Sequence, residues 1–319
     1  MREELLKELE TEYDRIRAEN ERTEDARKEK IRTERPEIHA LVRERQELVH
    51  RGLRAILDKN EAADRIPEKM MKLTAEIREK LTAAGFPEDY LAPVYRCPIC
   101  KDTGRVGELI REPCECLKKA YQKKLREKIG LKSDRQETFE TFDLSVFPDD
   151  LLPGRNYSQR QQMDIARDDC QEWANRFPEA ESRNLLLTGK SGLGKTFLLH
   201  AIAERLIERD VNVLIISAYK MLEIVRKAYF SNEETTDEIT DTDVLMIDDL
   251  GSEPMMQNVT VEQLFNLLNE RQNKGLSTII STNLTMEELQ NRYTERIASR
   301  LRERHYWKVI TLEGKDIRS

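Results

Sequence analysis

The residues best suited to chemistry form a glycine-rich loop between an apolar run and a helical pattern. The run Leu185-Leu186-Leu187-Thr188 leads into Gly189, Lys190, Ser191, Gly192, Leu193, Gly194, Lys195 and Thr196, which fit G-x-x-x-x-G-K-[ST]. Glycines let backbone N–H groups and a helix N-terminus surround a phosphate. Lys195 would reach the β- and γ-phosphates of ATP, and the Thr196 hydroxyl would bind Mg²⁺. A chance glycine-rich turn is disfavoured, because every position and both flanks agree.

An acidic pair at the end of another apolar run supplies the second half of such a site. Val244-Leu245-Met246-Ile247 leads into Asp248 and Asp249, about fifty residues after the loop. Asp248 would hold the hydrated Mg²⁺, and Asp249 would orient and polarise the attacking water. Many ATPases have Glu at the second position. Because Asp is one methylene shorter, the water must lie closer or hydrolysis must be slow. Acidic residues that merely end a strand are the structural alternative.

Two further polar groups follow along the chain. Asn283 ends the run Thr278-Ile279-Ile280-Ser281-Thr282, where it would share the attacking water or touch the γ-phosphate; taken alone, it would cap the next turn. Arg296 and Arg300 lie four residues apart on one face of a predicted helix. An arginine that contacts the γ-phosphate bound by a neighbouring subunit stabilises transition-state charge. The structural alternative is that each arginine is an ordinary surface residue.

Four of the five cysteines are closely spaced. Cys97 and Cys100 are followed after thirteen residues by Cys114 and Cys116, and this set fits a tetrahedral thiolate site for Zn²⁺. A redox-active pair is the alternative, and it is disfavoured because no thioredoxin-like βαβ pattern surrounds the motif. Cys170 is expected to be a buried or idle thiol on a helix.

These motifs require an α/β domain to position them. Apolar runs of strand length begin at Leu185, Val211, Val244 and Thr278, and they alternate with helical patterns. The helices are expected at about 195–209, 219–229, 261–273 and 286–293. Continuously apolar strands predict a parallel sheet covered on both faces. The acidic, threonine-rich stretch 231–241 reads as a mobile loop, and 285–288 reads as a capping box.

The N-terminal region is predicted to be a helical arm. An apolar stripe of Leu5, Leu9, Tyr13 and Ile16 disappears between Arg17 and Lys30, which predicts a charged helix without packing partners. After Pro36, a second helix carries Ile38, Leu41, Val42, Leu48, Val49, Leu53, Ile56 and Leu57, and a third runs from about 67 to 84. More apolar surface than the arm can cover predicts docking on a partner protein. A solvated spacer or a coiled coil is the alternative.

A basic stretch follows the cysteines. Lys118, Lys119, Lys123, Lys124, Arg126, Lys128 and Lys132 fall on an expected helix. They would contact phosphate backbones or belong to a solvated linker helix, and the sequence leaves both interpretations open.

Composition limits the class of protein. The chain has 319 residues, 54 Lys and Arg against 61 Asp and Glu, and a net charge of −7, so any DNA contact requires a local basic patch. No apolar run approaches the length of a membrane span, and the start lacks the apolar core of a signal peptide. We expect a cytoplasmic protein without membrane contact, whose cysteines form no disulfide framework.

Together these motifs resemble the AAA+ ATPases of bacterial helicase loaders of the DnaC/DnaI type, which are related to IstB-type transposition ATPases. The resemblance covers about 139–319 and includes the stretch Asp248-Asp249-Leu250-Gly251-Ser252-Glu253. It implies that Lys195 and Thr196 are Walker A residues, Asp248 and Asp249 are Walker B residues, and Asn283 is sensor 1. Arg300 would be the arginine finger acting in trans, with Arg296 as the alternative, and Arg318 would be sensor 2. Nineteen residues after Arg300 leave no room for the usual C-terminal helical lid.

The expected organisation is a helical arm at 1–93, a zinc module with a basic linker helix at 94–135, and a lidless AAA+ domain at 136–319. By the resemblance, the arm grips a hexameric replicative DNA helicase, and the AAA+ domain self-associates and contacts single-stranded DNA. ATP would act as an assembly and release switch with slow hydrolysis. The alternatives are an IstB-like ATPase acting with a transposase on double-stranded DNA, and an interaction protein with an inactive ATPase.

Overall fold

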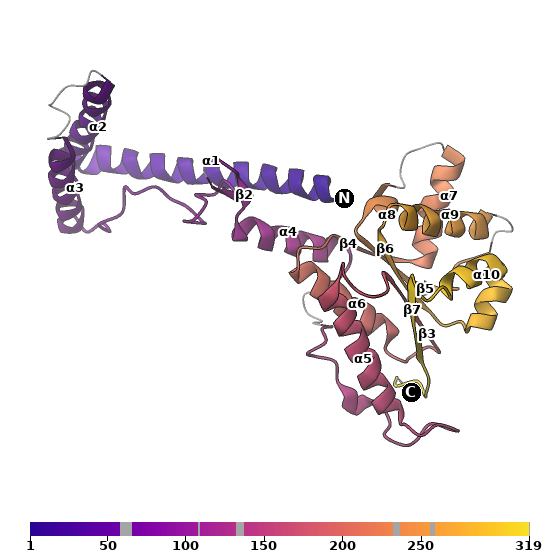
Figure 1. Cartoon of the computed structure of the whole chain (residues 1–319). Helices are drawn as coiled ribbons and strands as arrows, with labels where there is room; N and C mark the ends of the chain where they lie inside the picture. The colour runs from indigo at the N-terminus through magenta and orange to yellow at the C-terminus, as the bar shows by residue number, and fades with distance from the viewer. Residues whose placement is uncertain (58–65, 108, 132–136, 232–236, 256–258, 319) are drawn as a thin grey trace. The chain divides into compact units, whose positions relative to one another are not determined.

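The computed structural model describes residues 1–57, 66–107, 109–131, 137–231, 237–255 and 259–318 (Figure 1). The chain forms two compact units, one of Met1–Leu6 with Lys118–Ser319 and the other of Lys7–Leu117. Helices α1 (Arg2–Glu34) and α4 (Glu115–Lys128) contribute to both units. The division of the chain at residues 93 and 135 stays a prediction.

The larger unit is built on a five-stranded parallel sheet with the order β4-β5-β6-β3-β7. The strands are β3 (Asn184–Gly189), β4 (Val213–Ser217), β5 (Val244–Leu250), β6 (Ser277–Thr282) and β7 (Trp307–Leu312). The first four confirm the predicted strands. The edge strand β7 was not predicted, because its buried and exposed residues mix over only six positions.

Helices cover both faces of this sheet, as the continuously apolar strands predict. They are α5 (Gln159–Arg176), α6 (Lys195–Glu208), α7 (Ala218–Ser231), α8 (Asp237–Asp241), α9 (Val259–Asn273) and α10 (Met286–Leu301), with a 3₁₀ turn at Leu144–Val146. Figure 1 shows α5 and α6 on one side of the sheet, and α9 and α10 on the other. None of the described helices has the length and apolar character that a membrane crossing requires.

Two local expectations meet different outcomes. The mobile loop predicted at 231–241 is wrong where it overlaps helix α8, whereas residues 232–236 lie outside the described part of the chain. The capping box is confirmed, because Thr285 accepts from Glu288 N and the Glu288 side chain accepts from Thr285 N. Helix α10 breaks at Thr294, whose φ of 77° separates the predicted segment 286–293 from the arginine-bearing segment after it.

The smaller unit contains most of α1, the helices α2 (Pro36–Leu57) and α3 (Ile66–Ala83), and the strand pair β1 (Arg105–Val106) and β2 (Glu112–Pro113). Pro36 begins α2, where its missing N–H costs no helical hydrogen bond. Ile31, Ile38, Ile77 and Leu81 form a buried cluster, with Leu41, Val42 and Phe86 packed beside it. The arm therefore covers part of the apolar surface that was expected to lack partners: Ile38 and Leu48 are buried, while Val49 is exposed. The side chains of Leu53, Ile56 and Leu57 lie outside the described residues.

The charged stretch Arg17–Lys30 does have partners, which corrects the prediction made for it. Arg17 donates to the carbonyl of Asp102 at 2.9 Å, and Arg27 donates to the carbonyl of Tyr90 at 3.3 Å. Glu24 accepts from the backbone N–H of Val94 at 2.9 Å. Within the stretch Arg17–Lys30, charged side chains rather than an apolar stripe attach α1 to the segment around the cysteines.

Candidate ATP site and cysteine cluster

The glycine-rich loop joins β3 to α6, as the motif requires. Gly189 ends the strand and Lys195 begins the helix. A Cβ on Gly189 would lie 2.3 Å from the carbonyl oxygen of Leu312, and one on Gly192 would lie 1.8 Å from a carboxylate oxygen of Asp316. Glycine is needed at Gly189 because the Leu312 backbone packs directly against it, and it is favoured at Gly192 because the φ there is 73°.

A cavity of about 660 Å³ opens at this end of the sheet. It brings together the predicted residues Ser191, Gly192, Leu193, Gly194, Lys195, Thr196, Asp248, Asp249, Asn283 and Arg318. Gly189 and Lys190 line an adjacent cavity of about 550 Å³. The carboxyl ends of parallel strands share one edge of the sheet, which is why β3, β5 and β6 deliver these groups to one place.

Lys195 is held by three acceptors. Its Nζ donates to the carbonyls of Gly189 at 2.6 Å and Lys190 at 2.7 Å, and to Oδ1 of Asn283 at 2.8 Å. Burial lowers the pKa of Lys195, while the charges of Asp249 and Asp248 oppose that shift. A buried ammonium next to the loop is suited to bind a phosphate anion.

The groups predicted to hold Mg²⁺ lie together. The Thr196 hydroxyl is 3.3 and 3.4 Å from the two carboxylate oxygens of Asp248. Mg²⁺ prefers such oxygen ligands at about 2.1 Å in an octahedral arrangement, so neighbouring ligands lie about 3 Å apart. The two residues therefore fit the ion. Ser281, to which no role was assigned from sequence, donates to Asp248 and accepts from the backbone N–H of Asp249 at 2.8 Å.

Asp249 has a backbone conformation that explains its residue type. Its φ is 60°, and the pairing of β5 with β6 shifts register between Ile247 and Leu250. Asp and Asn tolerate this left-handed region better than longer side chains do. The carboxylate accepts from Nδ2 of Asn283 at 2.5 Å. The bulge thus favours the short acid at a position where many ATPases have Glu.

The C-terminal segment brings Arg318 to the cavity. Ile317 N donates to the carbonyl of Gly192 at 3.1 Å. The amide side chain of Gln159 accepts from Lys315 N and donates to Lys315 O, both at 2.9 Å. No motif in the sequence identified Gln159, which lies 156 residues from its partner.

Arg296 and Arg300 lie elsewhere in the same unit. They line a different cavity, together with Phe265. The Arg296 guanidinium is 3.7 Å from the Phe265 ring centroid, and Arg300 donates to Gln272 at 2.9 Å. Neither arginine is among the residues that line the ATP-site cavity of its own chain. The action of Arg300 in trans stays a prediction.

The four predicted cysteines converge. All four sulfur atoms lie within 4.8 Å of one another, with Cys97 and Cys114 at 3.9 Å and Cys100 and Cys116 at 3.4 Å. A tetrahedral Zn²⁺ with bonds of about 2.3 Å requires sulfurs about 3.8 Å apart. The donor set therefore fits zinc, and the cluster is suited to hold a metal ion.

Groups distant in sequence surround this cluster. The Tyr13 hydroxyl donates to the sulfur of Cys116 at 3.2 Å. The buried carboxylate of Asp102 accepts from the backbone N–H of Cys97 at 2.7 Å and from Asn20 at 2.8 Å. The backbone N–H of Cys100 lowers the pKa of Cys97 to about 7. Sequence reasoning assigned Tyr13, Asn20 and Asp102 no role at the metal site. Cys170, in contrast, is fully buried in the other unit, and its burial raises the pKa of its thiol.

Helix α4 carries the predicted basic run, and several of its cations have acidic partners. Arg126 pairs with Glu204 at 2.7 Å, and Lys128 pairs with Glu4 and Glu238. Lys132 lies outside the described residues. These pairs favour the linker-helix interpretation, because paired cations are less available to phosphates.

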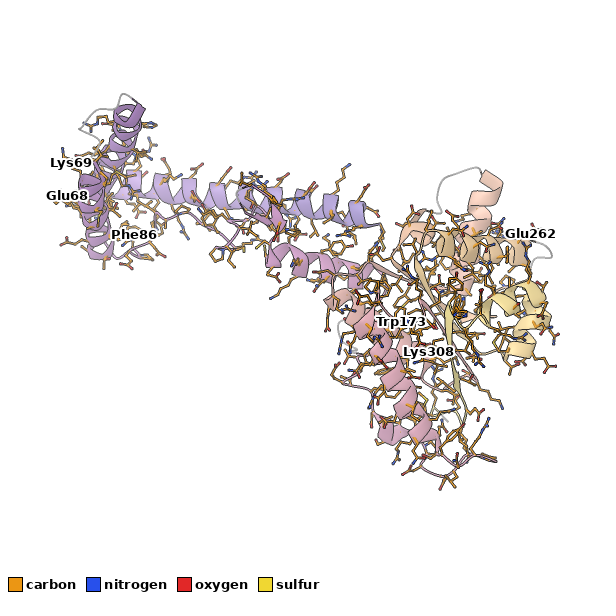
Figure 2. The ribbon with its side chains drawn as sticks, viewed as in Figure 1. Glu68, Lys69, Phe86, Trp173, Glu262 and Lys308 are labelled. Carbon is orange, nitrogen blue, oxygen red and sulfur yellow. The ribbon has the colours of Figure 1, made fainter. Side chains whose placement is uncertain are left out.

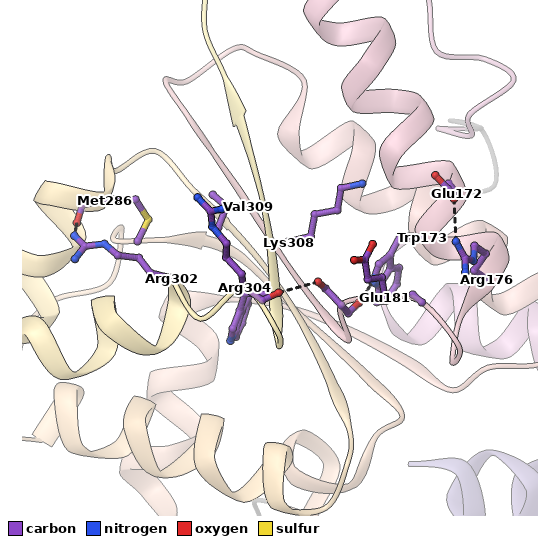
Figure 3. A pocket seen from close by; sticks show the side chains of 12 residues that line it. Glu172, Trp173, Arg176, Glu181, Met286, Arg302, Arg304, Lys308 and Val309 are labelled. Carbon is purple, nitrogen blue, oxygen red and sulfur yellow. Dashed lines mark hydrogen bonds and ion pairs between the residues drawn. The ribbon is translucent and has the colours of Figure 1, made fainter.

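A further cavity of about 650 Å³ lies between α5, β7 and the residues beside α10 (Figure 3). Trp173 and Lys308, labelled in Figure 2, are among its lining residues. Arg176 and Glu172, which also line it, form an ion pair at 3.2 Å. No residue predicted to take part in chemistry lines it.

The parallel sheet, the phosphate-binding loop after β3 and the acidic end of β5 define a P-loop ATPase domain of the AAA+ class. The family described as "IstB-like ATP binding protein" matches residues 134–319, more than half of the chain. The chain belongs to this family, and the resemblance seen in the motifs is thereby confirmed.

Two relatives and one solved structure resemble this chain. "Replicative helicase loader DnaI" of Bacillus subtilis (strain 168) is 32% identical over 150 residues, which are 43% of this chain and 48% of that protein. "Replicative helicase loader DnaC" of Escherichia coli (strain K12) is 28% identical over 125 residues, which are 37% and 50%. The chain spans about half the length of each. A solved structure, "Crystal Structure of the DnaI", has 26% identity, covers 61% of this chain and 98% of its own, and gives a TM-score of 0.44.

Proposed function

We propose that the protein is an ATP-dependent loader of the hexameric replicative DNA helicase and acts in the cytoplasm. The observation that carries this proposal is the 32% identity to a replicative helicase loader over 150 residues. ATP with Mg²⁺ serves as an assembly and release switch and is hydrolysed slowly.

Each group in the cavity has a role in this cycle. Lys195 binds the β- and γ-phosphates, and Thr196 with Asp248 holds Mg²⁺, which neutralises phosphate charge. Asp249 accepts a proton from the attacking water, and Asn283 orients the Asp249 carboxylate through its 2.5 Å hydrogen bond. Arg318 approaches the phosphates as sensor 2.

The unit Lys7–Leu117 binds the helicase. Among the described residues, the most exposed large apolar side chains lie in this unit: Leu109 at 99%, Ile110 at 79%, Met71 at 74% and Ile99 at 73%. We infer that these exposed apolar side chains form the contact surface for another protein. Zinc bound by the four cysteines rigidifies the segment that presents Ile99, Leu109 and Ile110.

The AAA+ domain self-associates and contacts single-stranded DNA. Arg300 then completes the ATP site of a neighbouring subunit, because its own chain's cavity does not include it. Arg296 is the alternative finger.

The partner is tested by substituting exposed side chains in the full-length protein. Met71→Asp and Leu109→Asp should each weaken binding of the replicative helicase at least about tenfold by light scattering, since the loss of one buried apolar anchor costs about 1.5–3 kcal/mol. Ile165→Asp is the matched control, because Ile165 is also exposed, at 63%, but lies in the ATPase unit. Unchanged helicase binding in both test variants would reject these side chains as contacts. No helicase binding by the wild-type protein would reject the loader function.

The family description supports a second candidate, an IstB-like ATPase that acts with a transposase on double-stranded DNA. ATP-dependent binding of double-stranded DNA together with a transposase, and no binding of helicase, would favour it. A third candidate is an interaction protein with an inactive ATPase. ATP hydrolysis by the wild-type protein that is lost in Lys195→Ala would exclude it.

A further inference from the structure

Two hydrogen bonds stabilise the turn that follows Asp249, one within the backbone and one to the Glu253 side chain. Ser252 N donates to the carbonyl of Asp249 at 3.1 Å, and Gly251 N donates to a carboxylate oxygen of Glu253 at 2.8 Å. Glu253 is only 1% exposed, although it is an acidic residue. The backbone beside the proposed water-activating carboxylate and the Glu253 side chain therefore form one rigid turn.

Glu253 also joins this turn to helix α10. The Tyr293 hydroxyl donates to the second carboxylate oxygen of Glu253, and Arg292 donates to the Glu253 backbone carbonyl at 2.5 Å. Tyr293 is fully buried. Arg292 and Tyr293 are the last residues of α10 before its break. The hydrogen bonds to Glu253 therefore hold the helix at that point.

The start of α10 is attached to the same site by a separate route. Thr282 donates to the carbonyl of Leu250 at 2.6 Å, which ties the end of β6 to the end of β5. A Cβ on Gly251 would lie 2.7 Å from the Leu284 side chain, so the turn and the residue after Asn283 are in close contact. Helix α10 then begins two residues after Leu284. Its first segment is thus held at both ends by residues that follow or flank Asp249 and Asn283 in the chain.

The break in α10 directs the segment that follows. Thr294 is β-branched and has a φ of 77°, a conformation that is rare for such a residue and that persists only where its surroundings enforce it. Arg296 and Arg300 come two and six residues later. Their direction is therefore set immediately after the Tyr293 anchor.

We propose that Glu253 is a positioning residue, which couples occupancy of the ATP site to the orientation of the segment that carries Arg296 and Arg300. ATP engages Asp249 and Asn283, the turn moves with them, and Glu253 transmits that movement to Tyr293 and the break at Thr294. The coupling rests on the proposed ATP binding. It adds a consequence to that function: the arginine finger is oriented toward the ATP site of a neighbouring subunit only when ATP is bound.

The test is Tyr293→Phe in the full-length protein, with Tyr121→Phe as the matched control. Tyr121 belongs to the same unit and also loses one hydroxyl hydrogen bond, but its partner is Asn212, at 3.2 Å, rather than Glu253. Hydrogen exchange is measured with and without a non-hydrolysable ATP analogue and Mg²⁺, in peptides that cover 189–196 and 292–301. A purely structural role for the Tyr293 hydroxyl would alter basal exchange or thermal stability without altering the ATP-dependent difference.

In the wild-type protein and in Tyr121→Phe, ATP is expected to change exchange in both peptides. In Tyr293→Phe the difference in 189–196 remains, at least half of the difference in 292–301 is lost, and kcat falls about tenfold with KM for ATP unchanged. Glu253→Gln should show the same loss. Protection of 189–196 without any change in 292–301 in the wild type overturns the coupling alone, as does a full response in Tyr293→Phe. No protection of 189–196 overturns ATP binding and the coupling with it.

Discussion

Asp249→Asn separates ATP binding from hydrolysis. The substitution removes the charge and keeps the shape, so the 2.5 Å bond from Asn283 has an oxygen to accept it. Asn also tolerates the φ of 60° at this position, so the bulge in β5 is retained. We expect ATP affinity to change by less than about threefold, or about 0.7 kcal/mol. Turnover should fall about 10²–10⁴-fold, the usual contribution of a positioned general base.

Lys195→Ala provides the contrast. The buried ammonium makes three hydrogen bonds, and each charge-assisted bond transferred to phosphate is worth about 1.5–3 kcal/mol. Loss of one to two such bonds predicts a decrease in ATP affinity of about 10²-fold or more. A third variant, Asp249→Glu, tests the backbone argument: it keeps the charge but should lose about 1 kcal/mol of unfolding free energy, because the longer side chain is disfavoured in the left-handed region.

The assay is titration with a fluorescent ATP analogue, followed by phosphate release at saturating ATP. Thermal unfolding of each variant shows whether the domain stays folded. If Asp249→Asn weakens ATP binding as strongly as Lys195→Ala, then Asp249 contacts phosphate or Mg²⁺ rather than water, and its assigned role is wrong.

Three further predictions concern the metal site, the finger and the core. Purified protein should contain about one zinc per chain, and Tyr13→Phe should weaken zinc retention against a chelator by about tenfold, because the Cys116 sulfur loses its donor. Arg300→Ala should bind ATP yet hydrolyse it poorly, and mixing it with Lys195→Ala should restore activity at mixed interfaces. Arg271→Met should lower the free energy of unfolding by about 3–5 kcal/mol, measured in urea, since this fully buried guanidinium donates to three carbonyls and a threonine hydroxyl.

Each of these has a contradicting result. Four freely titrating thiols in folded, metal-free protein would contradict the zinc site. Mixtures that assemble normally but regain no activity would place the finger elsewhere, with Arg296 next in line. A loss below about 1 kcal/mol for Arg271→Met would show that its backbone acceptors find other partners.

Sequence reasoning identified the groups whose partners lie within a few residues or whose motif implies them. The spacing from Gly189 to Thr196 is sufficient to predict a phosphate loop, since the strand, loop and helix are local. The continuously apolar runs predict the central strands of a parallel sheet for a similar reason: burial on both faces leaves a pattern in the residue types themselves. The cysteine spacing likewise indicates a metal site before any coordinates are known.

Contacts between distant segments were decided by the tertiary structure alone. Tyr13 reaches Cys116 across 103 residues, and Gln159 holds the segment that brings Arg318 to the cavity. The charge-rich stretch of α1 carries no apolar signal, yet ion pairs and hydrogen bonds give it partners. The bond between Tyr293 and Glu253 belongs to the same class, because hydrogen bonds between remote side chains leave no periodic trace in a single sequence. The residue types of Asp249 and Thr294 likewise do not reveal their left-handed backbone, which is imposed by the packing of the strands and helices around them.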